Sequence, residues 1–355
     1  MMKVMQIQDE WNPEHIRLAE RPRPEPGPGE VLVRMEAASV NYRDVLMSRR
    51  GYGRRSGALP LVPLSDGAGR VVAVGAGVTR VAVGDLVCPI FGQTWLSGSI
   101  REEHWAEVLG GPRDGVMQEY MVLRQEGVVR APRHMTALEA ATLPCAAVTA
   151  WNALVAQGGV KAGDVVLVQG TGGVSLFALL FAKMHGARVL ATSSSDAKLE
   201  RLKAMGADHL VNYRNTPEWH KVAREVTGGL GVDLVVEVGG AGTLESSVRA
   251  VRCSGTIALI GVLSGVAASL ALGPVVTQNI RMQGVTVGSR ELFEDMARAM
   301  ELWRTAPPID ESVFAFEQVA EAITALPAGR HFGKVCLHPR RPRARRPPAA
   351  RGRRG

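Results

Sequence analysis

A strand-like segment that runs directly into a glycine-rich loop constrains the fold of this chain most strongly. Residues Val165–Gln169 predict a strand, the next six residues have the sequence Gly-Thr-Gly-Gly-Val-Ser, and residues 174–185 predict an apolar helix. Glycine permits a tight turn, and the backbone can then approach a pyrophosphate at the positive N-terminus of the helix. Because the loop lies between a strand and a helix, it predicts a dinucleotide-binding site rather than a connector without a ligand.

Strand and helix patterns alternate after this loop. We expect strands at 187–192, 209–212, 233–238, 256–260 and 285–287, and helices at 196–205 and 244–251. Such alternation predicts a parallel, doubly wound sheet of the Rossmann type, and therefore an α/β fold class.

The N-terminal part has a different pattern. Residues 1–125 are rich in strand signals, at 30–36, 69–74 and 86–90, separated by glycine-containing turns. Two amphipathic helices at 291–303 and 317–325 and a short strand at 335–337 follow the Rossmann-type region. We therefore predict a β-rich domain over 1–125, a dinucleotide-binding domain over 126–288, and a C-terminal return segment.

The charge of the chain is concentrated at its C-terminus. The formal net charge is +8, and residues 339–355 contain eight arginines and no acidic residue, so the remaining residues carry no net charge. A tail of Pro, Arg, Ala and Gly cannot form a core, which favours a disordered, solubilising segment. Weak contact of this tail with nucleic acid or anionic lipid is the alternative.

The cysteines and the apolar segments exclude several classes. Cys88, Cys145, Cys253 and Cys336 are far apart, so neither a disulfide framework nor a clustered zinc site is expected. The N-terminus has no apolar signal segment. The uncharged run at 256–280 is broken by glycines and Pro274, which favours a strand with loops over a membrane span. We expect a cytoplasmic protein without a membrane segment.

The end of the second expected strand bears on the choice of nucleotide. NAD-selective folds place an acid there, whereas this chain has Ser193, Ser194 and Ser195. Hydroxyls can bind a 2′-phosphate that an acid would repel, and Lys198 can supply charge, although it is equally typical of a solvated helix surface. Asp196 argues for NAD, but it fits better as a helix N-cap or first-turn acid. These residues favour NADPH.

With these features in place, the chain resembles the medium-chain dehydrogenase/reductase superfamily over about residues 3–338, in its zinc-independent quinone-oxidoreductase branch. The matching strings are residues 38–44, 66–72, 83–87, 143–151, 170–175 and 331–335. The resemblance implies a GroES-like catalytic domain at 1–125 that residues 289–338 complete, beside a Rossmann NADP-binding domain at 126–288.

The departures from the zinc-dependent members are informative. Those members have a cysteine at the position of Asn41 and a His-Glu pair at the position of Ser65-Asp66; only Cys145 keeps a ligand type. Residues 91–117, where a structural zinc would bind, contain no cysteine. A catalytic zinc requires three protein ligands, so no metal site is expected, and Cys145 fits better as a small buried residue.

Without a Lewis acid, hydride transfer to a quinone or an activated C=C or carbonyl group is favoured, because conjugation spreads the developing charge. The resemblance implies that Asn41 and Asp44 lie beside the nicotinamide and that Tyr52 and Thr149 line the same site. We predict that Asn41 orients the substrate oxygen and that Tyr52 donates a hydrogen bond or a proton. Asn41 and Asp44 also have the spacing of a helix cap, and Tyr52 is as consistent with a surface aromatic.

The resemblance implies further cofactor contacts. They are Gly170, Thr171, Gly172, Gly173 and Val174 of the loop, Tyr213, Gly261, Val262 and Leu263, Val287, Gly288 and Ser289, and Phe332, Gly333 and Lys334. We expect a homodimer acting on a small-molecule substrate. The alternatives are a zinc-free enoyl-thioester or alkenal reductase, and an NADPH-binding protein that binds nucleic acid through its basic tail.

Overall fold

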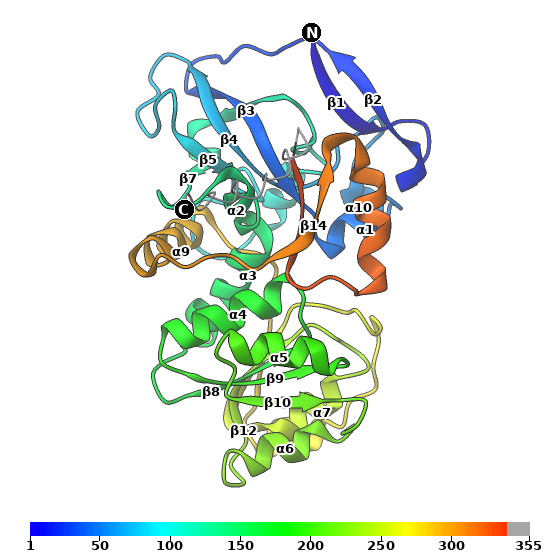
Figure 1. The fold of residues 1–355 in the computed structure, drawn as a ribbon, viewed down its shortest axis with the longest axis vertical. Helices are drawn as coiled ribbons and strands as arrows, with labels where there is room; N and C mark the ends of the chain where they lie inside the picture. Colours follow the sequence, from blue (N-terminus) through cyan, green and yellow to red (C-terminus); the bar gives the residue numbers. More distant parts are fainter. Residues whose placement is uncertain (339–355) are drawn as a thin grey trace, which may run out of the picture.

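Two large β-sheets, one above the other in Figure 1, form the framework of the computed structural model, which describes residues 1–338. The lower sheet is six-stranded and parallel, and the upper one is seven-stranded and largely antiparallel. The predicted α/β fold with a β-rich part and a Rossmann-type part is confirmed.

The parallel sheet has the strand order β10-β9-β8-β11-β12-β13. Its strands are β8 (Val165–Gln169), β9 (Arg188–Ser193), β10 (His209–Asn212), β11 (Val232–Glu237), β12 (Val251–Leu259) and β13 (Arg281–Gly284). The order reverses beside β8, and in such sheets ligands bind where the strand order reverses, at the carboxyl ends of the strands.

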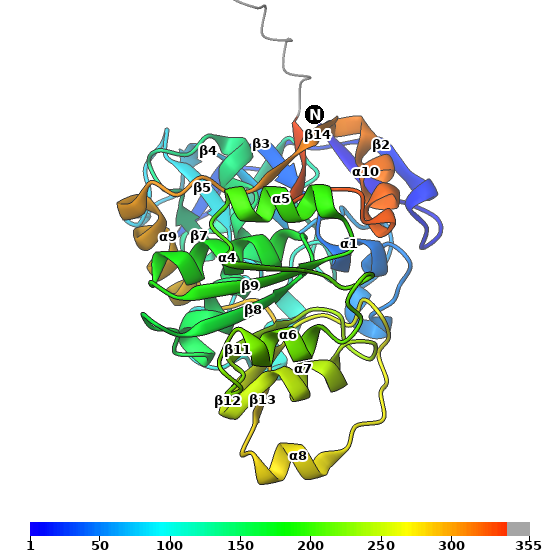
Figure 2. The same ribbon diagram turned by 60° about the horizontal axis from the view of Figure 1, so that its bottom comes forward.

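Helices cover both faces of this sheet, as Figure 2 shows. Alternate residues of β8 point to opposite faces: Val166 and Val168 pack with α4, and Val165 and Leu167 pack with α6 and α7. This explains why β8 is apolar throughout. The covering helices are α4 (Gly173–Met184), α5 (Asp196–Ala204), α6 (Trp219–Glu225) and α7 (Leu244–Ala250).

The second sheet has the order β14-β15-β3-β4-β5-β7, and β6 also pairs with β3. Its strands are β3 (Glu30–Ser39), β4 (Asp66–Val74), β5 (Leu86–Pro89), β6 (Tyr120–Arg124), β7 (Val128–Arg130), β14 (Ile309–Ala315) and β15 (Lys334–His338). β1 (Met2–Ile7) and β2 (Ile16–Arg21) form a separate hairpin. The C-terminal strands β14 and β15 thus return to the N-terminal sheet.

Five further helices complete this part. They are α1 (Tyr42–Met47), α2 (Ala137–Ala140), α3 (Val148–Trp151), α9 (Arg290–Trp303) and α10 (Val319–Ala325). The 3₁₀ turns of the described residues lie at Pro13–His15, Gly53–Ser56, Glu102–Glu107, Gln125–Gly127, Phe316–Gln318 and Leu326–Ala328. Two π-helical segments, Leu143–Ala147 and Asn152–Gln157, flank α3 where the two sheets meet.

The structure corrects the prediction in one segment. Residues 285–287 form no strand; the sixth strand is β13, Arg281–Gly284, which pairs with β12. Val285 and Val287 are buried because they pack into the core, not because they pair in the sheet. Sequence patterns also missed α6 and the helix α8 (Leu272–Thr277), which lies in the uncharged run. Among residues 1–338, no helix is long and apolar enough to span a membrane.

Candidate functional site

The glycine-rich loop joins β8 to α4 at the carboxyl edge of the parallel sheet. Gly170 has a φ of +73°, which a side chain would strain. A Cβ placed on Gly172, the N-cap of α4, would meet nothing within 4 Å, so open space lies in front of the helix N-terminus. Ser175 donates to the Gln169 carbonyl (2.7 Å) and fixes the loop onto the strand. The loop therefore fits the pyrophosphate of a dinucleotide.

The hydroxyl-rich segment follows β9, the neighbouring strand. Ser193 is buried, and its hydroxyl accepts a hydrogen bond from the Ser195 N–H (3.3 Å). Ser195 is the N-cap of α5, and Asp196 is an exposed acid in its first turn, as predicted. Tyr213, whose N–H donates to the Ser193 carbonyl (3.0 Å), is exposed beside them. The structure brings these predicted residues together.

Lys198 contacts the C-terminal return segment. Its ammonium donates to the carbonyls of Gly329 (2.7 Å) and His331 (2.8 Å), and burial lowers its pKa. One turn farther along α5, the guanidinium of Arg201 lies 3.9 Å from the ring centroid of Phe332. Lys198 is therefore not an ordinary solvated helix residue. Two of the three ammonium hydrogens are used on these carbonyls, which leaves one for a ligand.

The return segment then passes the glycine-rich loop. Gly333 has a φ of +88°, and its N–H donates to the Thr171 carbonyl (2.9 Å). A Cβ on Gly173 would lie 2.6 Å from Cδ of Lys334, so the lysine side chain runs across the start of α4. Glycine at position 173 is required by this close approach.

Lys334 ends in a buried polar cluster with Asn41 and Asp66. Its ammonium donates to the carbonyl of Val40 (2.9 Å) and to Oδ1 of Asn41, and it lies 3.8 Å from Oδ2 of Asp66. Lys334 is 2% exposed and Asp66 is completely buried. Asp66 also accepts hydrogen bonds from the Ser65 hydroxyl (2.7 Å) and the Cys145 N–H (3.0 Å). The positive and the negative charge therefore compensate each other.

Asn41 precedes α1, but its side chain makes no cap hydrogen bond. Instead, Asp44 accepts the Asn41 N–H at Oδ2 (2.7 Å), and Arg43 lies 3.4 Å from its Oδ1. Asp44 is buried, which raises its pKa to about 6 although Arg43 opposes this effect. The Nδ2 atom of Asn41 is buried and has no hydrogen-bond partner among residues 1–338.

Tyr52 and Thr149 lie around this cluster. Tyr52 is 41% exposed. Partial burial raises the pKa of its phenol, the charge of Arg43 opposes this shift, and Cys145 and Asp44 add to it. Thr149 is buried on α3, and its hydroxyl donates to the Cys145 carbonyl (2.7 Å). Burial raises the pKa of the Cys145 thiol to about 12, in keeping with a structural cysteine.

The remaining predicted contacts lie on neighbouring loops. Val287 and Ser289 are buried before α9, and a Cβ on Gly288 would lie 2.6 Å from Val148, next to Thr149. A Cβ on Gly261, after β12, would meet the Val238 carbonyl at 2.3 Å. Val262 and Leu263 are about half exposed. Val174 is half-buried and packs against the main hydrophobic core, and Ser194 is half-buried after β9.

Sequence analysis missed two buried polar residues, Gln169 and Glu237, which end β8 and β11. Both lie at the carboxyl edge where the glycine-rich loop begins. For Gln169 a signal was available, because it is a polar residue that closes an otherwise apolar strand.

The donor set at Asn41, Ser65 and Cys145 does not fit a catalytic zinc. It offers one thiol, one amide and one hydroxyl, whereas zinc sites use thiolate, imidazole and carboxylate ligands. Asp66 could supply an oxygen, but it is already bonded to Ser65 and Cys145 and lies beside Lys334. Within the described residues, no group of three His, Cys, Asp or Glu side chains is arranged to hold a metal ion.

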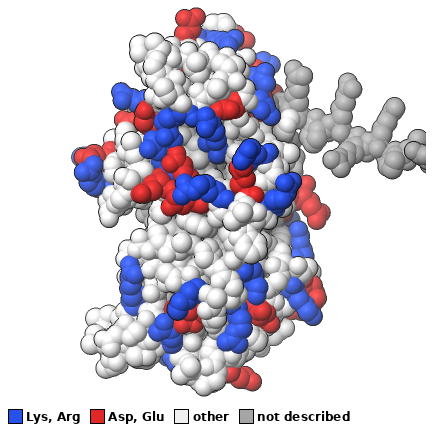
Figure 3. All heavy atoms as spheres, turned by 90° about the vertical axis from the view of Figure 1, so that its left-hand side faces the viewer, with Lys and Arg blue, Asp and Glu red and all other residues white. Residues whose placement is uncertain are grey.

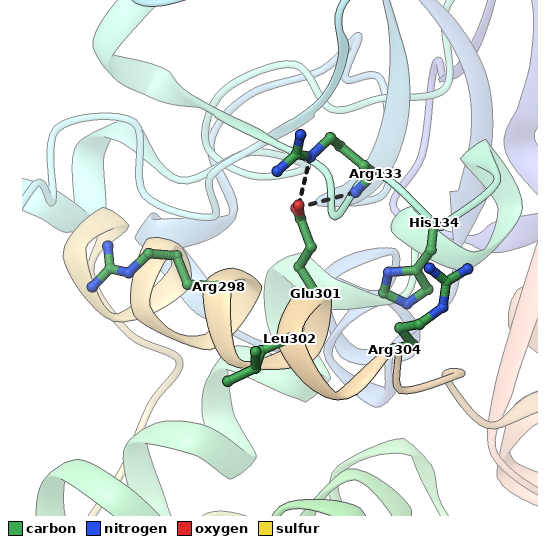
Figure 4. A pocket seen from close by; sticks show the side chains of 6 residues that line it. All are labelled: Arg133, His134, Arg298, Glu301, Leu302 and Arg304. Atoms are coloured by element: carbon green, nitrogen blue, oxygen red, sulfur yellow. Dashed lines mark hydrogen bonds and ion pairs between the residues drawn. The ribbon is translucent and has the colours of Figure 1, made fainter.

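A surface pocket of about 710 Å³ lies elsewhere, at the C-terminal end of α9. Figure 4 shows its lining by Arg133, His134, Arg298, Glu301, Leu302 and Arg304. Arg133 pairs with Glu301, and Arg298 pairs with Asp295. None of the predicted site residues lines this pocket. Figure 3 shows the left-hand side of the molecule, where basic and acidic residues are intermixed over the upper part.

Two family models match long stretches of the chain. Residues 27–133 match the family model of the alcohol dehydrogenase GroES-like domain, and residues 173–303 match that of the zinc-binding dehydrogenases. A zinc-type alcohol dehydrogenase-like protein of Schizosaccharomyces pombe is 42% identical over 335 residues, which cover 93% of this chain and 95% of that protein.

Two solved structures are similar over nearly the whole chain. One, described as an NAD-dependent alcohol dehydrogenase, is 37% identical with a TM-score of 0.86, covering 95% of this chain and 99% of its own. The other, a quinone oxidoreductase of Pseudomonas syringae pv. Tomato DC3000, is 26% identical with a TM-score of 0.80, covering 96% of this chain and all of its own.

Proposed function

The chain belongs to the medium-chain dehydrogenase/reductase superfamily, and we propose that it is an NADPH-dependent member that reduces a quinone or an activated C=C or carbonyl group without zinc. Members of this superfamily are oxidoreductases that bind a nicotinamide dinucleotide. The observation that carries the proposal is the contact of the buried Lys334 ammonium with Asn41 and Asp66, which stand where zinc-dependent members have a cysteine ligand and the acid of a His-Glu pair, respectively.

The cofactor would bind along the carboxyl edge of the parallel sheet. Gly170, Thr171, Gly172, Gly173 and Val174 would hold the pyrophosphate at the N-terminus of α4, where open space lies in front of Gly172. Residues 287–289 and 332–334 would enclose the nicotinamide half, since they lie beside Val148 and beside Thr171 respectively. When bound, NADPH supplies a hydride from its nicotinamide ring.

Selectivity for NADPH is supported by the end of β9. Ser193, Ser194 and Ser195 present hydroxyls at the N-terminus of α5, and no acid follows Ser193 directly. The carboxylate of Asp196 is already engaged, because it accepts a hydrogen bond from the Asn212 amide (2.6 Å). Lys198 uses two of its three hydrogens on carbonyls, so the third remains for a 2′-phosphate.

The chemistry is supported by the hydrogen-bond donors around Asn41. Nδ2 of Asn41 is a buried donor without a partner among residues 1–338, and a substrate oxygen would satisfy it. As hydride adds to the substrate, negative charge develops on that oxygen, and preorganised donors stabilise it. Tyr52 is exposed enough to reach solvent and would donate the proton. Asp44 would act indirectly, by holding the backbone of Asn41.

A screen of NADPH oxidation tests the proposal. We expect turnover with quinones or enones and no oxidation of simple alcohols with NADP⁺. Turnover confined to enoyl thioesters or alkenals would favour the alternative reductase. If none of these acceptors is reduced and simple alcohols are oxidised, the proposal is wrong.

The basic tail, Pro339–Gly355, lies outside the described residues. An enzyme of the proposed kind should keep its NADPH oxidation when this tail is deleted. A protein whose role is nucleic-acid binding should instead lose its affinity for DNA or RNA on deletion, while NADPH binding persists. The proposed domain division at 125/126 is tested by limited proteolysis; β7, just beyond it, pairs with β5 in the seven-stranded sheet.

We also propose that the protein is a homodimer. β13 is an edge strand of the parallel sheet, and α8 beside it has no buried residue. Figure 2 shows α8 projecting from the body. Leu272 and Val276 are 66% and 72% exposed, and exposed apolar groups of this kind mark interaction surfaces. Sedimentation equilibrium should show a dimer that Leu272→Glu with Val276→Glu weakens; a parent monomer at micromolar concentration would contradict this.

A further inference from the structure

Lys334 is the only described residue whose charged side chain reaches both the glycine-rich loop and Asn41. Its stem packs against Gly173, and its ammonium donates to Val40 and Asn41. At 2% exposure, it is isolated from solvent. The chain keeps this charge buried beside Asp66, at the junction of the two parts of the molecule.

The contact with Lys334 fixes the orientation of the Asn41 carboxamide. A lysine ammonium only donates hydrogen bonds, so the atom of Asn41 that faces it must be the acceptor Oδ1. Nδ2 then points away from Lys334. The structure gives Nδ2 no partner among residues 1–338, although it is buried. The Lys334 ammonium therefore holds Nδ2 of Asn41, a hydrogen-bond donor, where none of residues 1–338 accepts its hydrogens.

From this arrangement we propose that Lys334 is a positioning residue for the reaction: its ammonium orients Asn41 so that Nδ2 donates to the substrate oxygen. The role in turnover rests on the proposed function, whereas the orientation of the carboxamide does not. The positive charge also polarises the amide, which strengthens Nδ2–H as a donor. A cation thus assists the developing oxyanion through Asn41 rather than by direct coordination.

Two neighbours keep the ammonium in place. Asp66 lies 3.8 Å away and is itself held by Ser65 and by the Cys145 N–H. Gly333, which precedes Lys334, is bonded to Thr171 of the glycine-rich loop. The position of Lys334 therefore depends on the same loop that would bind the cofactor, and Asn41 is aligned with the nicotinamide half of the site.

A double-mutant cycle tests the proposal, with kcat measured at saturating NADPH. Lys334→Met keeps most of the side-chain volume and removes the charge; we expect kcat to fall at least about tenfold, with KM for the acceptor changed much less. Because Lys334 acts through Asn41, Lys334→Met should cause no further loss in an Asn41→Ala background. If the two losses multiply, or if Lys334→Met keeps the parental kcat, the proposal is overturned.

Two further variants keep the test decisive. Lys183→Met removes a lysine that pairs with Asp208 at the far end of α4 and should leave kcat unchanged. Asn41→Asp keeps an acceptor for Lys334 but removes the donor, so its kcat should fall to the level of Asn41→Ala. Even if Lys334→Met does not fold, parental kcat in Asn41→Asp would overturn the proposal, because Nδ2 would then not be the donor that Lys334 positions.

A structural readout separates this proposal from the proposed function. In crystal structures without cofactor, Oδ1 of Asn41 should face Lys334 in the parent, and the carboxamide should be rotated or disordered in Lys334→Met. An unchanged carboxamide in the variant would overturn the positioning role. A parent that reduces no acceptor would refute the proposed function and leave this comparison intact.

Discussion

The side-chain amide of Gln169 donates to the carboxylate of Glu237 across two adjacent parallel strands, with 2.8 Å between Nε2 and Oε2. Glu237 is completely buried and also accepts hydrogen bonds from Ser247, Thr243 and two backbone N–H groups, those of Gly239 (2.8 Å) and Gly240 (3.0 Å). Oε1 of Gln169 accepts a hydrogen bond from the N–H of Val238 (3.2 Å). This network holds the loop after β11 against the start of the glycine-rich loop.

Glu237→Gln should therefore destabilise the protein. The new amide places hydrogens where donors of Gln169 or Gly239 already point, and a buried donor left unpaired costs roughly 1–3 kcal/mol. Urea unfolding at pH 7 should show this loss, and NADPH should bind more weakly because the adjoining loops shift. Glu245→Gln, which removes an exposed acid paired with Arg249, is the matched control. Equal unfolding free energies for both variants would contradict the importance of the network.

The fold was largely predictable because its signals are local. Gly170 to Ser175 between an apolar strand and an apolar helix, and the alternation that follows, predicted the parallel sheet. The strand β13 was missed because its sequence, Arg-Met-Gln-Gly, has no apolar run: it lies at the sheet edge and pairs only with β12. Val285 and Val287 resembled a strand only because both side chains enter the core.

The site was predictable only in part because it assembles residues from distant segments. Asn41 and Lys334 are 293 positions apart, and only the return of β15 to β3 brings them together. The resemblance implied that Lys334 contacts the cofactor, but nothing local indicated its contact with Asn41. Likewise, the pattern around Lys198 did not predict that its ammonium binds the carbonyls of Gly329 and His331.

The purified protein should contain no stoichiometric zinc. Asn41 and Ser65 replace two ligand types, and the remaining thiol at Cys145 cannot hold a catalytic metal alone. Elemental analysis should give well under one zinc per chain, and turnover should survive treatment with a chelator. Addition of zinc after chelation serves as the control and should not raise activity. One tightly bound zinc, with activity lost on its removal, would disprove the zinc-free assignment.

Asp44→Asn should change how stability depends on pH. Burial raises the pKa of Asp44 from 3.8 to about 6, so the folded state binds this proton more tightly than the unfolded state does. In the parent, this group therefore favours unfolding increasingly as the pH rises from about 4 to 6. An asparagine can still accept the Asn41 N–H and has no such charge.

The stability difference between Asp44→Asn and the parent should therefore shift in favour of the variant over this range, by roughly 3 kcal/mol at most. Urea unfolding at several pH values from 4 to 7 measures it. Asp9→Asn removes a carboxylate at an exposed position and serves as the control. A difference that stays constant, or shifts the other way, would show that Asp44 is not a buried acid with a raised pKa.

Tyr52→Phe should lower turnover less than Asn41→Ala does. Tyr52 is 41% exposed, so water can replace its hydroxyl as the proton source, whereas Nδ2 of Asn41 is buried. Loss of one preorganised donor costs about 10²–10³ in kcat. Steady-state kinetics with the best quinone or enone acceptor distinguishes the two variants, and thermal stability controls for damage to α1. If both variants keep the parental rate, the site works by positioning donor and acceptor alone.

NADPH should bind more tightly than NADH, and Ser193→Asp should reverse this order. Ser193 is buried at the end of β9, where a new carboxylate would repel a 2′-phosphate and accept a hydrogen bond from the ribose 2′-hydroxyl of NADH. A tenfold preference corresponds to about 1.4 kcal/mol, which one charge-assisted hydrogen bond supplies. Ser193→Ala separates the two effects, because it removes the hydroxyl without adding charge and should weaken NADPH only. Fluorescence titration gives each dissociation constant, and equal values for the two cofactors in the parent would refute the assignment.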